Sequence, residues 1–242
     1  MFQVKAYSKG QDAKAGEVIR LIPTNKQVAS DVYVLPERKA IIDLSHPECT
    51  AVLPDTLLSL GIHWHDYRLL ATHLHFDHIG NPLNMGKPIL YTSAGEIEHY
   101  RTDTESAVWK DFPLAQEGKV ADRFIAQERA GGVQLASLDA LPDIKKRSVE
   151  GLLNEQSNGL YYAIMKGHSM AHAVFAYVVH GFTYLFYGDA AAYSVNPHIS
   201  LNEQERITVR EQLIAINKRK NGNFQTFAGH TNNPYDSMVS RF

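Results

Sequence analysis

The chain has 242 residues, enough for one sizeable globular domain with a buried core. Its 24 lysines and arginines nearly balance 26 aspartates and glutamates, and the formal net charge of −2 provides no broad positive field to attract nucleic acid or an anionic membrane. A single cysteine, Cys49, excludes an internal disulfide and a cysteine-rich metal cluster. No secretory signal or apolar run of about 18 residues is present, so we expect a cytoplasmic protein.

The first third of the chain is rich in short β-branched and apolar runs. Residues 31–36 and 39–44 predict a hairpin whose second strand ends at Asp43. Residues 55–61 predict a short helix that ends at a glycine. Residues 68–72 predict a buried strand that runs directly into a cluster of histidines.

The rest of the chain alternates helix signals with strands. Residues 93–96 and 200–203 both have the Ser-x-x-Glu spacing of a capping box and predict two helices. Residues 101–146 are polar and irregular, and we expect a cap inserted over a site. Four strands are predicted in the second half: 160–165, 173–179, 182–187 and 224–227. This order predicts packed sheets flanked by helices in a single domain over residues 1–242.

The histidine cluster at residues 72–80 reads Thr-His-Leu-His-Phe-Asp-His-Ile-Gly. Its imidazole and carboxylate donors suit zinc or a similar divalent ion. His-x-His-x-Asp-His should arise by chance in a chain of this length with a probability on the order of one in a thousand. If the strand continues through His73 and His75, both imidazoles point to one side, and a turn can direct Asp77 and His78 to a second ion. One motif can therefore serve two metals.

This motif resembles the hallmark of the metallo-β-lactamase-fold hydrolase superfamily, in which three further ligand elements follow in a fixed order. Similar elements occur here in that order: Gly167-His168-Ser-Met-Ala-His172, Gly188-Asp189 and Gly229-His230. The resemblance spans about residues 31–230. It implies an α+β fold, the four-layer αββα sandwich with two mixed sheets flanked by helices, and ligands on loops along one edge.

The resemblance also implies a role for each matching residue. One metal is bound by His73, His75 and His168. The second is bound by Asp77, His78 and His230, and Asp189 bridges the two. Asp43 falls where the superfamily has an aspartate at the end of an early strand, which implies that it orients a ligand histidine from behind.

Two such metals explain how the chain can work without a nucleophilic side chain. Divalent ions about 3.5–4 Å apart can share one water and lower its pKa from 15.7 towards 7, while one ion polarises the substrate oxygen. The sequence contains no recognisable nucleophile motif, phosphate cradle or dinucleotide fingerprint. We expect two Zn²⁺ ions, with iron, manganese or cobalt as alternatives for these ligands.

The remaining histidines have weaker spacing. We expect His172 to be structural and hydrogen-bonded within its loop. His63 and His65 look like a ligand pair but lack nearby partners, so we expect them to be non-catalytic. Three others are expected at the surface or in turns: His46, His99 and His180.

Departures from subfamily patterns narrow the substrate class. Metallo-β-lactamases that hydrolyse antibiotics generally have cysteine or serine at the position of Asp189. Glyoxalase-II-type thioesterases need a helical C-terminal domain, whereas 12 residues follow His230 here. Nucleases and phosphodiesterases of the superfamily usually add a basic exosite or a second domain. The closest pattern is that of the N-acyl-homoserine lactonase-like branch.

The lactonase branch has a tyrosine three residues after the bridging aspartate, which assists the leaving alkoxide. Here Ala192 is third and Tyr193 fourth, and a one-residue slip in the loop can still present Tyr193 to the site. We therefore expect Tyr193 and the metal-bound Asp77 to take part in the reaction.

These observations predict a dinuclear, zinc-dependent hydrolase in which a metal-bridging hydroxide cleaves a small-molecule ester or lactone. A phosphodiesterase of the same superfamily is the main alternative. A thioesterase and a single-iron oxygenase on the same fold are further alternatives. We expect a small-molecule substrate and neither nucleic acid nor membrane as a partner, and the oligomeric state stays open.

Overall fold

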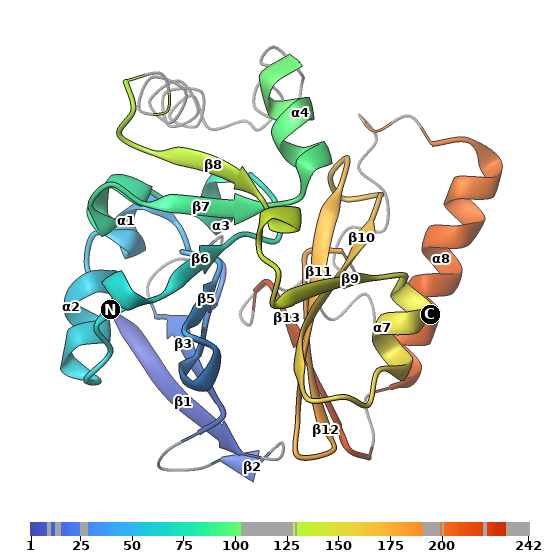
Figure 1. Cartoon of the computed structure of the whole chain (residues 1–242), viewed down its shortest axis with the longest axis horizontal. Coiled ribbons are helices and arrows are strands. Elements are labelled where there is room, and N and C mark those ends of the chain that lie inside the picture. Colours follow the sequence, from blue (N-terminus) through green and yellow to red (C-terminus); the bar gives the residue numbers. More distant parts are fainter. Residues whose placement is uncertain are drawn as a thin grey trace.

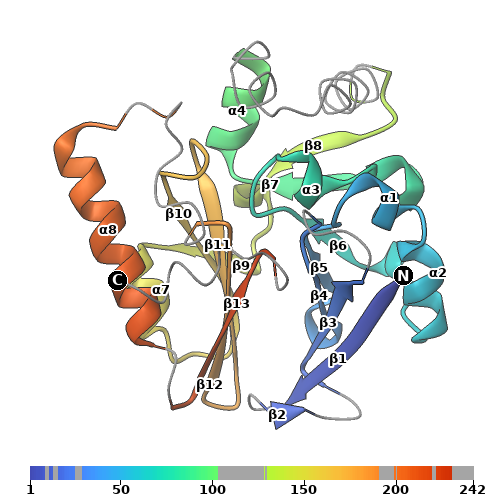
Figure 2. The ribbon, with the colours of Figure 1, turned by 180° about the vertical axis from the view of Figure 1, so that it is seen from behind.

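The computed structural model describes residues 1–8, 11–12, 16–24, 29–102, 128, 130–190, 199, 201–219 and 222–230. Two β-sheets face each other at its centre, and helices cover their outer faces (Figures 1 and 2). The first sheet has, in spatial order, β2 (Gln11–Asp12), β1 (Phe2–Ser8), β3 (Val18–Pro23), β4 (Val32–Leu35), β5 (Ala40–Ile42), β6 (Arg68–Leu70), β7 (Ile89–Thr92) and β8 (Gln134–Ser137). The second has β13 (Phe224–Ala228), β12 (Phe182–Gly188), β11 (His172–Val179), β10 (Gly159–Met165) and β9 (Ile144–Arg147).

The helices form the outer layers. Those near the first sheet are α1 (Pro47–Thr50), α2 (Leu53–Ser59), α3 (Phe76–Ile79) and α4 (Ala94–Thr102), with short 3-10 turns η1 (Pro36–Arg38), η2 (Trp64–Asp66) and η3 (Pro82–Met85). Beyond β8 come η4 (Leu138–Ala140), α7 (Val149–Asn154) and α8 (Glu203–Lys218). Helices α7 and α8 lie on the outer face of the second sheet (Figure 1).

Period-two alternation in the strands explains why both faces of each sheet are apolar. In β4, Val32 and Val34 face the outer helices, whereas Tyr33 and Leu35 face the second sheet. The buried apolar residues accordingly form three clusters, one between the sheets and one under each helical layer. Three apolar interfaces between four layers make the expected αββα sandwich, so the predicted fold is confirmed.

Most predicted elements occur where they were expected. The hairpin of residues 31–36 and 39–44 is the antiparallel pair β4 and β5. Helix α2 ends just before Gly61, whose φ of 72° is easy for glycine and strained for other residues. The four strands of the second half correspond to β10, β11, β12 and β13.

Two expectations differ from the structure. The capping box of α8 is formed by Asn202 and Glu205, two residues after the expected pair, and Ser200 lies outside the described residues. The segment 101–146, expected to be irregular, contributes β8 to the first sheet, and β9 begins within it. Residues 103–127 and 129 lie outside the described residues, so the cap stays a prediction.

Among the described residues, no helix has the length and apolar character needed to cross a membrane.

Candidate metal centre

Strand direction brings the predicted ligands to one end of the sandwich. In the first sheet, the loop with His73 and His75 follows the end of β6. In the second sheet, β10, β12 and β13 all run in one direction, because β11 is antiparallel to both β10 and β12 and β13 is parallel to β12. His168, Asp189 and His230 follow the ends of these three strands, so they meet at one edge.

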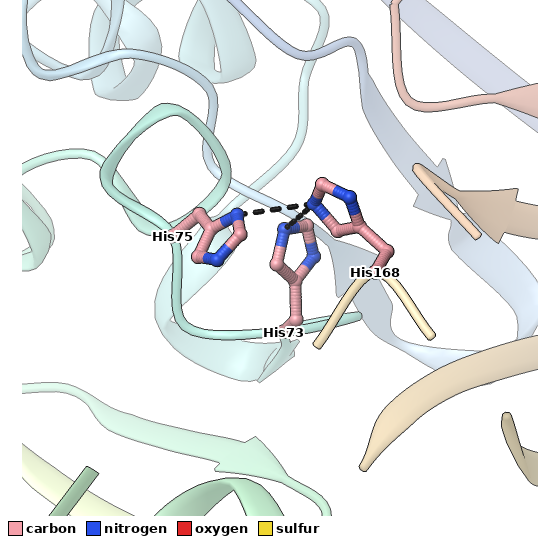
Figure 3. A group of neighbouring side chains, drawn as sticks. All are labelled: His73, His75 and His168. Atoms are coloured by element: carbon pink, nitrogen blue, oxygen red, sulfur yellow. Dashed lines mark hydrogen bonds between the residues drawn. The ribbon is translucent and has the colours of Figure 1, made fainter. Parts of the chain in front are cut away.

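The first group of donors is His73, His75 and His168, whose imidazoles point towards one another (Figure 3). Nε2 of His168 lies 3.1 Å from Nε2 of His73 and 3.1 Å from Nδ1 of His75. Around a tetrahedral zinc with Zn–N bonds of about 2.0 Å, two ligand nitrogens lie about 3.3 Å apart. The three imidazoles therefore have the spacing that one such ion requires.

The second group is Asp77, His78, Asp189 and His230. Nε2 of His230 lies 3.3 Å from Oδ2 of Asp77 and 3.2 Å from Oδ2 of Asp189. Nε2 of His78 lies 3.3 Å from the same Asp189 oxygen. One donor atom from each residue lies within 4.8 Å of the others, which also suits a single ion.

The Asp189 carboxylate joins the two groups. Its Oδ2 atom is 3.7 Å from Nε2 of His168 in the first group, besides its contacts with His78 and His230. Asp189 is 3% exposed, so its charge is removed from bulk water. The structure thus gathers all seven predicted ligands, with the expected bridging residue between the two triads, and metal binding by them stays a prediction.

The first group consists of neutral imidazoles. Burial, together with the neighbouring histidines, lowers the pKa of His73 and His168 well below the ordinary value. Burial also lowers the pKa of His75 to about 4. Neutral imidazole is the form that binds metals, so this group needs no proton removed near pH 7.

The second group holds opposite charges close together. Burial opposes protonation of His78, but Asp189 and Asp43 outweigh it and raise its pKa to about 10. Burial likewise opposes the charge on His230, whose pKa is nevertheless raised well above its usual range by Asp189 and Asp77. Without a metal, protons on these histidines balance the carboxylates, and a divalent cation can replace them.

Asp43 holds His78 from behind. Its Oδ2 atom lies 2.8 Å from Nδ1 of His78, and its Oδ1 atom accepts a 2.8 Å hydrogen bond from the backbone N–H of Thr72. Because Nδ1 faces this carboxylate, Nε2 of His78 is turned towards Asp189. The contact is the orienting interaction that the resemblance implied for Asp43.

Two features show that the residues fit a cation. Oδ1 of Asp189 is buried yet makes no hydrogen bond within the described part of the chain, a state that costs about 1–3 kcal/mol. A Cβ atom at Gly229 would lie 2.2 Å from Oδ1 of Asp189 and 2.8 Å from Cε1 of His78. Glycine at this position keeps that space open beside donor atoms that coordination would satisfy.

Other histidines among the described residues belong to neither donor group, including His46, His65 and His172. His172 is buried, but its Nε2 is 3.0 Å from the carbonyl oxygen of Tyr187 in β12, so the expected hydrogen bond within its own loop is wrong. His46 caps α1 by accepting the N–H of Glu48, and His65 stacks on Trp64. Tyr193 lies outside the described residues, so its expected role stays a prediction.

Sequence reasoning missed a segment that supports the second group. The N–H of Ser30 donates to the carbonyl of Asp77, and the N–H of Asp31 donates to that of Gly229. The hydroxyl of Tyr33 donates to the carbonyl of Ala228 at 2.6 Å. These bonds join residues far apart in the chain, and no local pattern signals them.

Glu96 was also missed as part of the site. Its spacing from Ser93 predicted a helix cap, and Ser93 Oγ does accept the N–H of Glu96. The Glu96 carboxylate, however, accepts hydrogen bonds from the N–H groups of Ala171 and Leu74, in the two loops that carry the first donor group.

Comparison with solved structures places this architecture among known ones. The chain is similar to the Rm3 metallo-β-lactamase, with a TM-score of 0.55 and 13% identity over 93% of this chain and 78% of that one. It is also similar to AidC, described as a dizinc quorum-quenching lactonase, with a TM-score of 0.52 and 13% identity over 88% and 73%. A third similar structure is MEM-A1, a subclass B3 metallo-β-lactamase from a soil metagenome library. Its TM-score is 0.54, with 13% identity over 93% of this chain and 80% of that one. No family model and no curated protein matches the sequence, so these likenesses establish the fold.

Proposed function

We propose that this chain, which has the metallo-β-lactamase fold, is a dinuclear metal-dependent hydrolase that cleaves a small-molecule ester or lactone. One observation carries the proposal. A single buried carboxylate, that of Asp189, lies between a triad of neutral histidines and a second cluster of histidines and aspartate. This arrangement suits two neighbouring divalent ions, which can activate a water for hydrolysis without a nucleophilic side chain.

When bound, two divalent ions supply an activated water and polarise the oxygen of the substrate. The residues of the chain set up that chemistry. The neutral imidazoles of His73, His75 and His168 would hold one ion. Asp43 orients His78 so that its Nε2 faces Asp189 in the group that would hold the other, and Asp189 lies where it would serve both.

The choice of a lactone or ester rests on the residue types. Asp189 stands where antibiotic-hydrolysing members of the fold generally have cysteine or serine. The phrase from His73 to Gly80 resembles that of lactonases, and AidC, one of the similar structures, is described as a lactonase. In this proposal Tyr193 protonates the leaving alkoxide.

The test measures the metal content and the hydrolytic activity of the same protein sample. Metal content per chain is measured on untagged protein, and the same sample is assayed with a small lactone and with bis(p-nitrophenyl) phosphate. Two metals with lactone turnover that falls on chelation, and in Tyr193→Phe, support the proposal. Diester cleavage alone would instead indicate a phosphodiesterase. A single iron, or full turnover without metal, would refute the dinuclear mechanism.

A further inference from the structure

We propose that Glu96, assisted by Ser93 at the start of α4, is a positioning residue that sets the spacing of the first donor group. The inference rests on the proposed metal-dependent function. The His73 loop, residues 71–75, carries two of the three imidazoles. The His168 loop, residues 166–171, carries the third. Glu96 binds both loops through one carboxylate.

The contacts lie close to the ligands in sequence. Oε1 of Glu96 accepts a 2.7 Å hydrogen bond from the N–H of Ala171, three residues after His168. Oε2 accepts a longer one, 3.4 Å, from the N–H of Leu74, which lies between His73 and His75. One carboxylate group therefore sets the distance between the two loops.

Ser93 provides a second hydrogen bond that holds the His168 loop against the start of α4. Its hydroxyl donates to the carbonyl of Ala171 at 2.6 Å, so both backbone polar groups of Ala171 are bound by the start of α4. Helix and loop also pack tightly, because a Cβ atom at Gly95 would lie 2.6 Å from that of Ala171. Glycine at this position permits the close approach that the two hydrogen bonds need.

Burial makes a purely local role for Glu96 a poor explanation. Glu96 is 4% exposed, and burying a carboxylate is costly unless hydrogen bonds compensate for the lost water. A capping glutamate could satisfy its helix from an exposed position by turning back to the N–H of Ser93. A capping-box glutamate that is buried and bonded to distant loops departs from the local capping pattern, and such departures concentrate at functional sites.

The His73 loop also bonds to β11, the strand that follows the His168 loop, through a 2.7 Å hydrogen bond from the N–H of Ala173 to the carbonyl of Thr72. This bond lies one residue before His73 and one residue after His172. It leaves the spacing of His75 and His168 to be set elsewhere. Glu96 binds nearer to these two residues and so acts on the 3.1 Å separation of their nitrogens.

Glu96→Gln is the decisive variant because both backbone partners of the carboxylate are N–H donors. A glutamine has one acceptor oxygen, so its NH₂ group must face one of the two donors, and one loop is released with no change in side-chain size. Glu98→Gln makes the same chemical change at an exposed position of the same helix and serves as the matched control. If Glu96→Gln does not fold, Ser93→Ala removes one link to the His168 loop and takes its place.

The readout is zinc affinity, measured by competition with a chelator, together with the rise in Tm that zinc produces. We expect Glu96→Gln to weaken binding of one zinc ion by about tenfold and to reduce the zinc-dependent rise in Tm, whereas Glu98→Gln behaves as the wild type. A purely structural role would lower Tm equally with and without zinc and leave the affinity unchanged, which would overturn the inference alone. If the wild type binds no metal at all, the proposed function fails, and this inference fails with it.

Discussion

Asp43→Asn tests whether the second donor group depends on the orientation of His78. Asp43 lies at φ 59°, a left-handed conformation that asparagine tolerates as well as aspartate, so the substitution leaves the backbone in place. In one orientation of the asparagine, its NH₂ group faces Nδ1 of His78. The imidazole then carries its proton on Nε2, the nitrogen that must donate its lone pair to a metal.

In the other orientation the NH₂ group faces the backbone N–H of Thr72, which loses the 2.8 Å hydrogen bond it now donates. A buried donor without a partner costs about 1–3 kcal/mol. Only this second orientation leaves the lone pair on Nε2 of His78 free for a metal, so zinc binding must meet that cost. Since each 1.4 kcal/mol changes an equilibrium constant tenfold, we expect one zinc ion to bind roughly 5- to 150-fold more weakly.

Chelator competition measures both zinc affinities, and circular dichroism checks that the fold is retained. Asp66→Asn is the control, because it makes the same change at an exposed aspartate whose ion pair with Lys39 spans 3.9 Å. Two zinc ions bound by Asp43→Asn with wild-type affinity would refute the role assigned to the Asp43–His78 contact.

Three other perturbations follow from the site. Gly229→Ala places a methyl group against Oδ1 of Asp189, so metal content should fall well below that of Gly151→Ala, a control in α7; equal content would contradict the fit. In the metal-free protein the pKa of His78 is about 10, raised above its usual value, so this residue is protonated at pH 7 and zinc must displace the proton. Affinity for the second ion should therefore increase with pH, and calorimetry should show proton release as binding heats that vary between buffers; identical heats would refute this. His65→Ala should keep both metals, because His65 stacks on Trp64 outside both donor groups, and loss of a metal would overturn its non-catalytic assignment.

Most of the predicted strands and the histidine motif could be recognised from short stretches of the sequence. The histidine motif is dense, and β4, β5 and β10 to β13 alternate or run apolar enough to read from their own residues. The seven ligands could be predicted because the cluster from His73 to His78 is dense, and because the resemblance adds three later residues that each follow a glycine: His168, Asp189 and His230. Their convergence required only that the strands preceding them end at one edge.

The missed features depend on partners elsewhere in the chain. Strand β9 contains exposed Lys145 and Lys146 and has little apolar alternation, so its pairing with β10 decides its conformation. The role of Glu96 was missed because it also depends on distant partners. Its spacing from Ser93 matches a capping box, but its carboxylate accepts hydrogen bonds from two distant loops. A single sequence records the residue type but not which of two hydrogen-bonding uses the tertiary structure selects.

The hydrogen bond from Asp31 to the carbonyl of Gly229 joins residues almost 200 positions apart, and His230 follows a strand at the edge of the second sheet. During synthesis at about 5–20 residues per second, the ribosome adds the stretch between His78 and His230 over roughly 8–30 s. For that interval the nascent chain exposes imidazoles without the residue that completes the second donor group. In the proposed dinuclear enzyme, loading of both ions therefore follows translation of the last ligand, and contacts of such long sequence separation slow the folding step that precedes it.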